Sequence, residues 1–194
     1  TPARPHRCPL TAPLVAESRR GAGGRCRVPA GRALLSAGPP MFFMGEEVCA
    51  SEPYRSRDVL GRREASQAWR EGSGAGMFAY YRDVIRLRLD KAALRSPLVE
   101  VIKVHDQDRV IAYRRWWNND EFLVVATFKD SGFPDGYEIA HESRKGKSWY
   151  ELFNSDRQDY GGSSLENEED LSSESGALNL KIPPCSITVL ARKN

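Results

Sequence analysis

Two adjacent glutamates, Glu46 and Glu47, are the first candidates for chemistry in this sequence. They directly follow a short apolar run, Met41 to Met44, so their carboxylates are expected at the end of a strand. Hydrolysis of a glycoside with retention of configuration uses two carboxyl groups that face each other about 5 Å apart. Neighbouring strand residues point to opposite faces, so this pair cannot easily form such a site alone. The two glutamates could therefore contact a substrate without catalysing a reaction. They could equally well belong to an acidic loop that is exposed to solvent.

Aromatic and basic side chains supply weaker candidates. Tyr54 and Arg55 lie in a long loop after the glutamates, where they could contact a substrate or simply be solvated. Trp116 and Trp117 could stack on sugar rings through their flat faces. Because they are adjacent on an expected strand, one should be in the core and only one could be a platform, and a packing role is favoured for both.

No cofactor or metal site is expected. The four cysteines and three histidines are scattered, and His6-x-Cys8 is their one close pair, too few ligands for zinc. The glycines from Gly72 to Gly76 lack the strand and the Gly-Lys-Ser/Thr that a nucleotide loop requires. We interpret them as a loop that leads into a helix.

The N-terminal segment differs from the rest in composition. Residues 1–35 hold seven arginines and one acid, whereas the remainder holds 22 basic and 25 acidic residues. Residues 1–33 show no helical or strand period and are predicted to be disordered or aberrant, as translation of GC-rich DNA out of frame would produce. The segment lacks the aromatic residues and motifs typical of nucleic-acid binding, so no nucleic-acid partner is expected.

The elements that would position the glutamates can be read from the apolar pattern. Met41 to Met44, bracketed by Pro40 and Gly45, predicts a strand buried on both faces, which is typical of parallel sheets. From Met77 to Ala93, apolar residues recur at three- and four-residue spacing and predict an amphipathic helix that Pro97 ends.

From Leu98 onward the pattern predicts strands. A three-stranded antiparallel meander is expected at Val99–His105, 109–117 and 121–128. Shorter strands are expected at 137–140, 148–153, 178–182 and 187–191. The fold class is therefore mostly β: an antiparallel, sandwich-like C-terminal domain after the last strand and helix of an incomplete (β/α)8 barrel.

Several of these segments resemble the α-amylase superfamily. Gly38-x-Pro40-x-x-x-x-Gly45-x-Glu47 is similar to its last barrel strand, and Met44-Gly-Glu-Glu47 has the form seen in bacterial α-glucan branching enzymes. The helix from Phe78, the segment 149–156 followed by Tyr160-Gly-Gly162, and the closing strand after Pro183-Pro184 also resemble that family. The match extends from about Leu34 to the end.

The resemblance implies the C-terminal part of a 1,4-α-glucan branching enzyme, which transfers glucan segments to a 6-hydroxyl without cofactor. It implies a barrel remnant at 34–96 and a β domain at 97–194, and the basic segment at 1–33 lies outside the resemblance. The family's catalytic carboxylates lie on earlier barrel strands and have no counterpart here, so the chain is expected to be inactive alone. Glu47 matches the closing glutamate of the motif.

Two further origins remain open: a maltooligosyl-trehalose trehalohydrolase-like enzyme, or a non-catalytic module that binds glucan or packs on a barrel. The expected partner in each case is an α-glucan or a barrel. No membrane span or secretory signal is recognised in the sequence, so a cytoplasmic location is expected.

Overall fold

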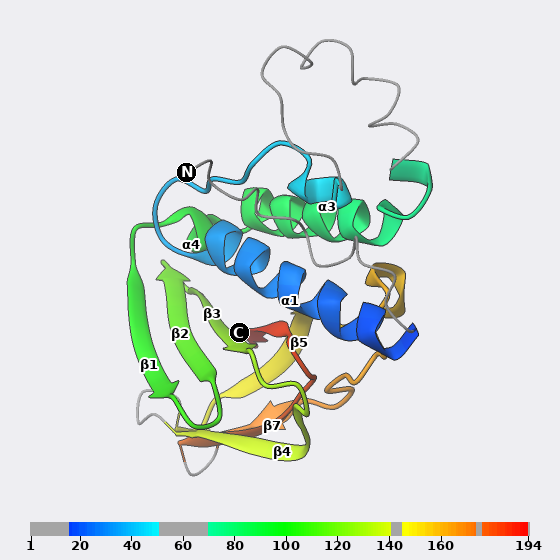
Figure 1. Cartoon of the computed structure of the whole chain (residues 1–194). Helices are drawn as coiled ribbons and strands as arrows, with labels where there is room; N and C mark the ends of the chain where they lie inside the picture. Colours follow the sequence, from blue (N-terminus) through cyan, green and yellow to red (C-terminus); the bar gives the residue numbers. More distant parts are fainter. Residues whose placement is uncertain (1–15, 51–69, 141–144, 174–175, 194) are drawn as a thin grey trace.

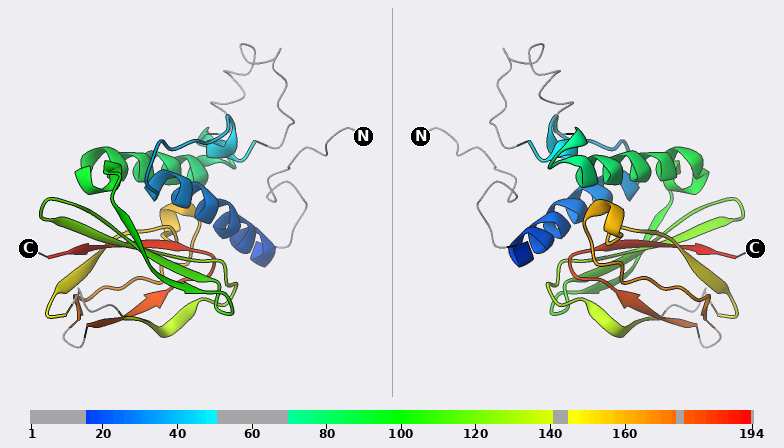
Figure 2. Two further views of the ribbon diagram at one scale, coloured as in Figure 1. Left: turned by 90° about the vertical axis from the view of Figure 1, so that its left-hand side faces the viewer. Right: turned by 90° about the vertical axis from the view of Figure 1, so that its right-hand side faces the viewer.

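The computed structural model describes residues 16–50, 70–140, 145–173 and 176–193, with side chains from residue 23 onward. Three helices lie over one face of a six-stranded sheet, and a two-stranded sheet covers the other face (Figures 1 and 2). We call these two sides of the large sheet the helix face and the sandwich face. No described helix has the length and apolar character needed to cross a bilayer.

The helical elements are α1 (Ala16–Leu35), η2 (Glu46–Val48), α3 (Ala75–Asp90), α4 (Ala92–Arg95) and the short turn η5 (Gln158–Tyr160). The helix predicted from Met77 to Ala93 is confirmed as α3 and α4, with a break at Lys91, whose backbone is extended. The buried side of α3 includes Met77, Tyr80, Tyr81 and Val84, which follow the three- and four-residue spacing of the sequence.

The strands are β1 (Val99–His105), β2 (Val110–Trp117), β3 (Asp120–Thr127), β4 (Phe133–Ala140), β5 (Ser148–Asn154), β6 (Leu171–Ser172), β7 (Ala177–Ile182) and β8 (Ile187–Arg192). The large sheet has the order β1-β2-β3-β8-β5-β6, and β4 pairs with β7. All pairings are antiparallel. The predicted fold class, mostly β with an antiparallel C-terminal domain, is confirmed.

Helix α1 contradicts the expectation that residues 1–33 lack regular structure, at least from residue 16 onward. The helix is rich in glycine and alanine, and its buried side mixes small residues such as Gly24 and Gly31 with Val28, Leu34 and Leu35. A Cβ atom at Gly31 would lie 2.1 Å from the Tyr80 hydroxyl and 2.9 Å from Ile187 Cγ2. The absence of side chains therefore lets α1 approach both α3 and β8, which a search for apolar periodicity cannot detect.

The run Met41 to Met44 also differs from expectation, because it forms no strand. The side chains of Met41 and Phe43 are 85% and 54% exposed, and Phe42 and Met44 are exposed as well. A strand buried on both faces requires neighbouring strands for its backbone groups and covering helices for its side chains. Among the described residues no strand lies beside this run, so each of its four apolar side chains remains at least 43% exposed.

Two apolar cores lie on the two sides of the large sheet. The core on the helix face includes Leu34 of α1, Tyr80 of α3, Leu94 of α4 and Val124 of β3. The core on the sandwich face includes Leu123, Trp149, Leu178 and Ile182. The helices thus share one core with the β strands, and the predicted boundary near residue 96 crosses it.

Candidate functional site

Glu46 and Glu47 lie in the turn η2, where their carboxylates bind the backbone of the same turn. Gly45 adopts a positive φ of 95°, and its N–H donates to Glu47 Oε2 over 2.8 Å. The N–H of Phe43 donates to Glu46 Oε2 over 3.2 Å. Each carboxylate accepts a hydrogen bond from a backbone N–H, and such a bond is stronger to a charged acceptor than to a neutral one. Both glutamates therefore have a structural role in this chain, and they do not face each other as an acid–nucleophile pair.

Helix α3 holds this turn in place. The Tyr81 hydroxyl donates to Glu46 Oε2 over 3.4 Å, and the Tyr81 ring contacts Phe42 at 5.2 Å between centroids. Burial, followed by the negative charge of Glu46, raises the pKa of Tyr81. Tyr81 therefore stays protonated and keeps its hydrogen to donate.

Arg88 of α3 fixes the other end of the run. Its guanidinium donates to the carbonyls of Leu34 at 2.6 Å, Ser36 at 2.9 Å and Gly38 at 2.6 Å. These carbonyls belong to the C-terminal end of α1 and to the chain just after it, where intrahelical partners end. The exposed run from Met41 to Met44 is thus held between Arg88 on one side and η2 on the other.

Arg115 of β2 extends the same arrangement to the β strands. It is fully buried, and it donates to the carbonyls of Leu98 at 3.0 Å, Leu94 at 3.1 Å, and also of Leu35 and Ser96. A buried guanidinium group is normally paired with a carboxylate. For Arg115, backbone carbonyls at the C-terminal ends of helices provide the negative potential instead. Sequence reasoning missed Arg88 and Arg115. The sequence did contain a sign of both. Arg88 falls at a position of the apolar side of its helix, and Arg115 falls at a core-facing position of its strand.

The Tyr160-Gly-Gly162 segment joins the β strands to the helices. The Tyr160 hydroxyl donates to Asp83 Oδ2 of α3 at 3.0 Å, and its carbonyl accepts from Arg27 of α1 at 2.7 Å. A Cβ atom at Gly162 would lie 2.0 Å from the carbonyl oxygen of Asp156, so only glycine fits there. This motif is therefore a packing junction in the described structure.

Trp116 and Trp117 separate as the strand alternation requires. Trp116 faces the sandwich side, where the Arg114 guanidinium lies 4.4 Å from its ring centroid. Trp117 is on the helix face at the end of β2, and it is 44% exposed. Trp117 is the one of the two that is open to a ligand.

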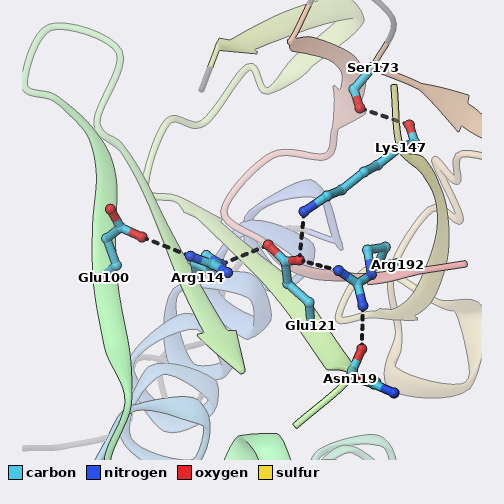
Figure 3. A network of polar contacts seen from close by, with 7 residues as sticks. All are labelled: Glu100, Arg114, Asn119, Glu121, Lys147, Ser173 and Arg192. Carbon is cyan, nitrogen blue, oxygen red and sulfur yellow. Dashed lines mark hydrogen bonds and ion pairs between the residues drawn. The ribbon is translucent and has the colours of Figure 1, made fainter. Parts of the chain in front are cut away.

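Beside Trp116, buried Glu121 is surrounded by three cations (Figure 3). Its carboxylate lies 2.7 Å from Arg114, 3.2 Å from Lys147 and 3.0 Å from Arg192. Arg192 also donates to the carbonyl of Asn119 in the turn after β2. This cluster ties β2, β3, β8 and the start of β5 together at one end of the large sheet.

The remaining sequence candidates give no further site. Tyr54 and Arg55 lie outside the described residues. Within residues 16–50, 70–140, 145–173 and 176–193, no group of three His, Cys, Asp or Glu side chains could hold a metal ion.

Known proteins resemble this chain in two ways. Residues 101–193 match the family model described as alpha amylase, C-terminal all-beta domain. A curated relative, the 1,4-alpha-glucan branching enzyme GlgB of Pseudomonas syringae pv. tomato (strain ATCC BAA-871 / DC3000), is 32% identical over 91 residues. The match covers 43% of this chain and 12% of the enzyme, so the chain spans a small part of that relative.

Solved structures extend the likeness in fold beyond the β strands. The alpha-amylase from Geobacillus thermoleovorans matches with a TM-score of 0.62 and 10% identity, over 92% of this chain and 36% of that one. The debranching enzyme from Nostoc punctiforme matches with a TM-score of 0.57 and 18% identity, over 87% of this chain and 32% of that one. Coverage this high includes the helices. Residues 101–193 therefore resemble the alpha amylase C-terminal all-beta domain, and the expected resemblance of this part of the chain to that superfamily is confirmed.

Proposed function

We propose that this chain is the C-terminal part of a 1,4-α-glucan branching enzyme, whose reaction transfers an α-glucan segment to a 6-hydroxyl. In this proposal α1, the run Met41–Met44 and α3 complete a (β/α)8 barrel, and the β strands form the domain that follows it. The similarity to a branching enzyme over 91 residues supports the choice of activity. An α-glucan is then the substrate class, and the cytoplasm is the proposed location.

The single observation that carries the proposal is the state of the run Met41–Met44. Its ends are held by Arg88 and by the turn η2, yet the four apolar side chains between them are exposed. Burying them against a barrel sheet would remove this apolar surface from water and would pair the backbone. Glu46 and Glu47 would then lie at the barrel mouth, together with the loop that contains Tyr54 and Arg55.

In this proposal the catalytic carboxylates lie in the part of the branching enzyme that precedes this chain. A retaining glucan enzyme needs two carboxyl groups about 5 Å apart, and the carboxylates of Glu46 and Glu47 instead cap their own turn. We therefore propose that the chain is inactive by itself and contributes the closing strand and the supporting domain.

The test is a chimera in which residues 16–194, which include all of α1, replace the corresponding end of the Pseudomonas syringae branching enzyme. We expect the isolated chain to have no branching activity and the chimera to branch amylose. Branching is measured as the fall in iodine-complex absorbance, with new 1,6 linkages counted after debranching. A matched chimera with Phe43→Asp is expected to lose activity, because a charge replaces an apolar side chain of the closing strand.

Other outcomes separate the alternatives. Branching by the isolated chain, or a folded chimera that does not branch, would contradict the proposal. Release of trehalose from maltooligosyl-trehalose by the chimera would instead indicate the trehalohydrolase-like origin. A free-standing module predicts glucan retention by the isolated chain together with an inactive chimera.

A further inference from the structure

We infer that the end of the β2–β3 hairpin is a stacking site for an α-1,4-linked glucan chain, with Trp117 as its platform. The site lies on the β domain and uses neither Glu46 nor Glu47. The choice of glucan rests on the proposed function, whereas the existence of a platform rests on the geometry of the hairpin.

Trp117 presents its ring on a fixed backbone. Trp117 pairs with Asp120 at the last position of the β2–β3 register. The preceding carbonyl, of Trp116, accepts from the Ser96 hydroxyl at 2.8 Å, and Arg115 donates to the Leu98 carbonyl at 3.0 Å. A platform held by its strand loses little conformational freedom when a ligand stacks on it.

Among the described residues, no side chain competes with a ligand for the ring of Trp117. In the part of the chain that the structure describes, no aromatic ring or cation lies against Trp117, whereas Arg114 occupies the ring of Trp116. Strand alternation places Trp117 on the helix face with Arg115, which pairs with Val99 of β1. Val99 is also 44% exposed. The two side chains are diagonal neighbours on one face and form a partly apolar surface.

Polar groups border this surface, as a sugar ring requires. Asp120 lies opposite Trp117, on the same face and exposed, and Asn118 and Asn119 form the exposed turn between them. A glucose unit has apolar C–H faces and a rim of hydroxyls. Its face can therefore stack on the indole while its hydroxyls donate to the Asp120 carboxylate and to the amide oxygens.

The experiment uses the full chain and two measurements of binding. Native electrophoresis in gels with amylopectin measures retardation, and titration with maltoheptaose measures quenching of tryptophan fluorescence. We expect Trp117→Ala to weaken binding about tenfold, as the loss of one aromatic stacking contact would do. We expect Trp117→Phe to retain most of the affinity, because a flat ring remains.

Phe128→Ala is the matched control. Phe128 is an aromatic residue with 36% exposure that directly follows β3, at the opposite end of the hairpin from Trp117. We expect it to bind like the parent chain. Because Trp117 and Phe128 are partly exposed to a similar extent, both changes should lower the thermal midpoint by a similar small amount, which is measured alongside.

Four results would overturn the inference: no retardation of the parent chain, equal binding by the Trp117→Ala variant, equal weakening in Phe128→Ala, or equal affinity for cellohexaose. The chimera assay separates this inference from the proposed function. A chimera that branches amylose while the isolated chain binds no glucan would remove the Trp117 site and leave the function. Glucan binding that depends on Trp117, together with an inactive chimera, would support the Trp117 site and contradict the proposed function.

Discussion

At the scale of single residues, Arg115 joins three parts of the chain through carbonyl oxygens. Its guanidinium reaches the end of α1 at Leu35, the end of α4 at Leu94 and Ser96, and the start of β1 through Leu98. No carboxylate is among these partners. The positive charge is stabilised by the negative ends of two helices, so its removal affects all three elements at once.

We therefore expect Arg115→Met to lower the free energy of unfolding by about 3 kcal/mol, because buried carbonyls would lose their donors. Urea unfolding followed by circular dichroism measures this change. Arg86→Met is the control, since Arg86 is on the exposed side of α3 and should have little effect. A similar midpoint for both variants would show that the hydrogen bonds of Arg115 contribute little.

Asp83 provides a prediction of pH dependence. The Arg82 guanidinium, and then the hydrogen bond from Tyr160, hold the pKa of Asp83 below its usual range although burial opposes them. A carboxyl with a lowered folded pKa stabilises the fold above its unfolded pKa, and this contribution is lost as the pH falls through the folded pKa.

Asp83→Asn is thus expected to cost about 1 kcal/mol at pH 7, because the partners are partly exposed. The difference from the parent chain should shrink as the pH falls below about 4, the ordinary pKa of aspartate. Urea midpoints between pH 3 and pH 7 measure it, with exposed Asp90→Asn as the control. A difference that stays constant over this range would contradict the role of the charge.

At the scale of elements, α1 shows why glycine content misleads a search for helices. Gly31 would normally weaken a helix, and replacing it by alanine in an exposed helix stabilises by about 1 kcal/mol. In this structure the added Cβ atom would lie 2.1 Å from the Tyr80 hydroxyl. Whether Gly31→Ala stabilises or destabilises the chain therefore shows whether α1 packs on α3 as described.

We expect Gly31→Ala to destabilise the chain by about 2 kcal/mol, because the overpacked helix must move away from α3 and β8. Thermal unfolding of the two proteins measures the difference. A second pair, Tyr80→Phe with and without Gly31→Ala, removes the clashing hydroxyl together with its hydrogen bond to the Arg27 carbonyl. In that background Gly31→Ala should cost less than in the parent chain. Stabilisation by Gly31→Ala alone would mean that α1 does not lie against Tyr80.

Most strands could be predicted closely, except β6 and the first half of β4, whereas α1 and the run Met41–Met44 could not. The pattern Val99–His105 carries its own period and turn residues, so local sequence determines β1. The close packing of Gly31 and the exposure of Met41 depend on contacts with distant or missing partners. For the same reason the sequence identified Glu46 and Glu47 as candidates but did not reveal that their carboxylates bind the backbone of their own turn.

At the scale of the whole molecule, one core joins the helices to the large sheet. Tyr113, Phe122 and Val124 of the sheet and Leu34 and Tyr80 of the helices are all buried in it. The β domain predicted from residue 97 would expose this side of the sheet if the helices were removed. It would also lose the carbonyls of Leu35, Leu94 and Ser96 that Arg115 uses.

A chain trimmed to residues 97–194 is therefore expected to unfold at lower urea concentration, with a broader transition, and to bind a hydrophobic dye. A chain trimmed to residues 16–194 keeps the shared core and should behave like the full chain. Equilibrium unfolding of the three chains, with dye fluorescence, measures this. Equal midpoints and slopes for the 97–194 and 16–194 chains would show that the β strands are an independent domain. Loss of cooperativity in the shorter chain alone would place α1, α3 and α4 in the same folding unit as the sheet.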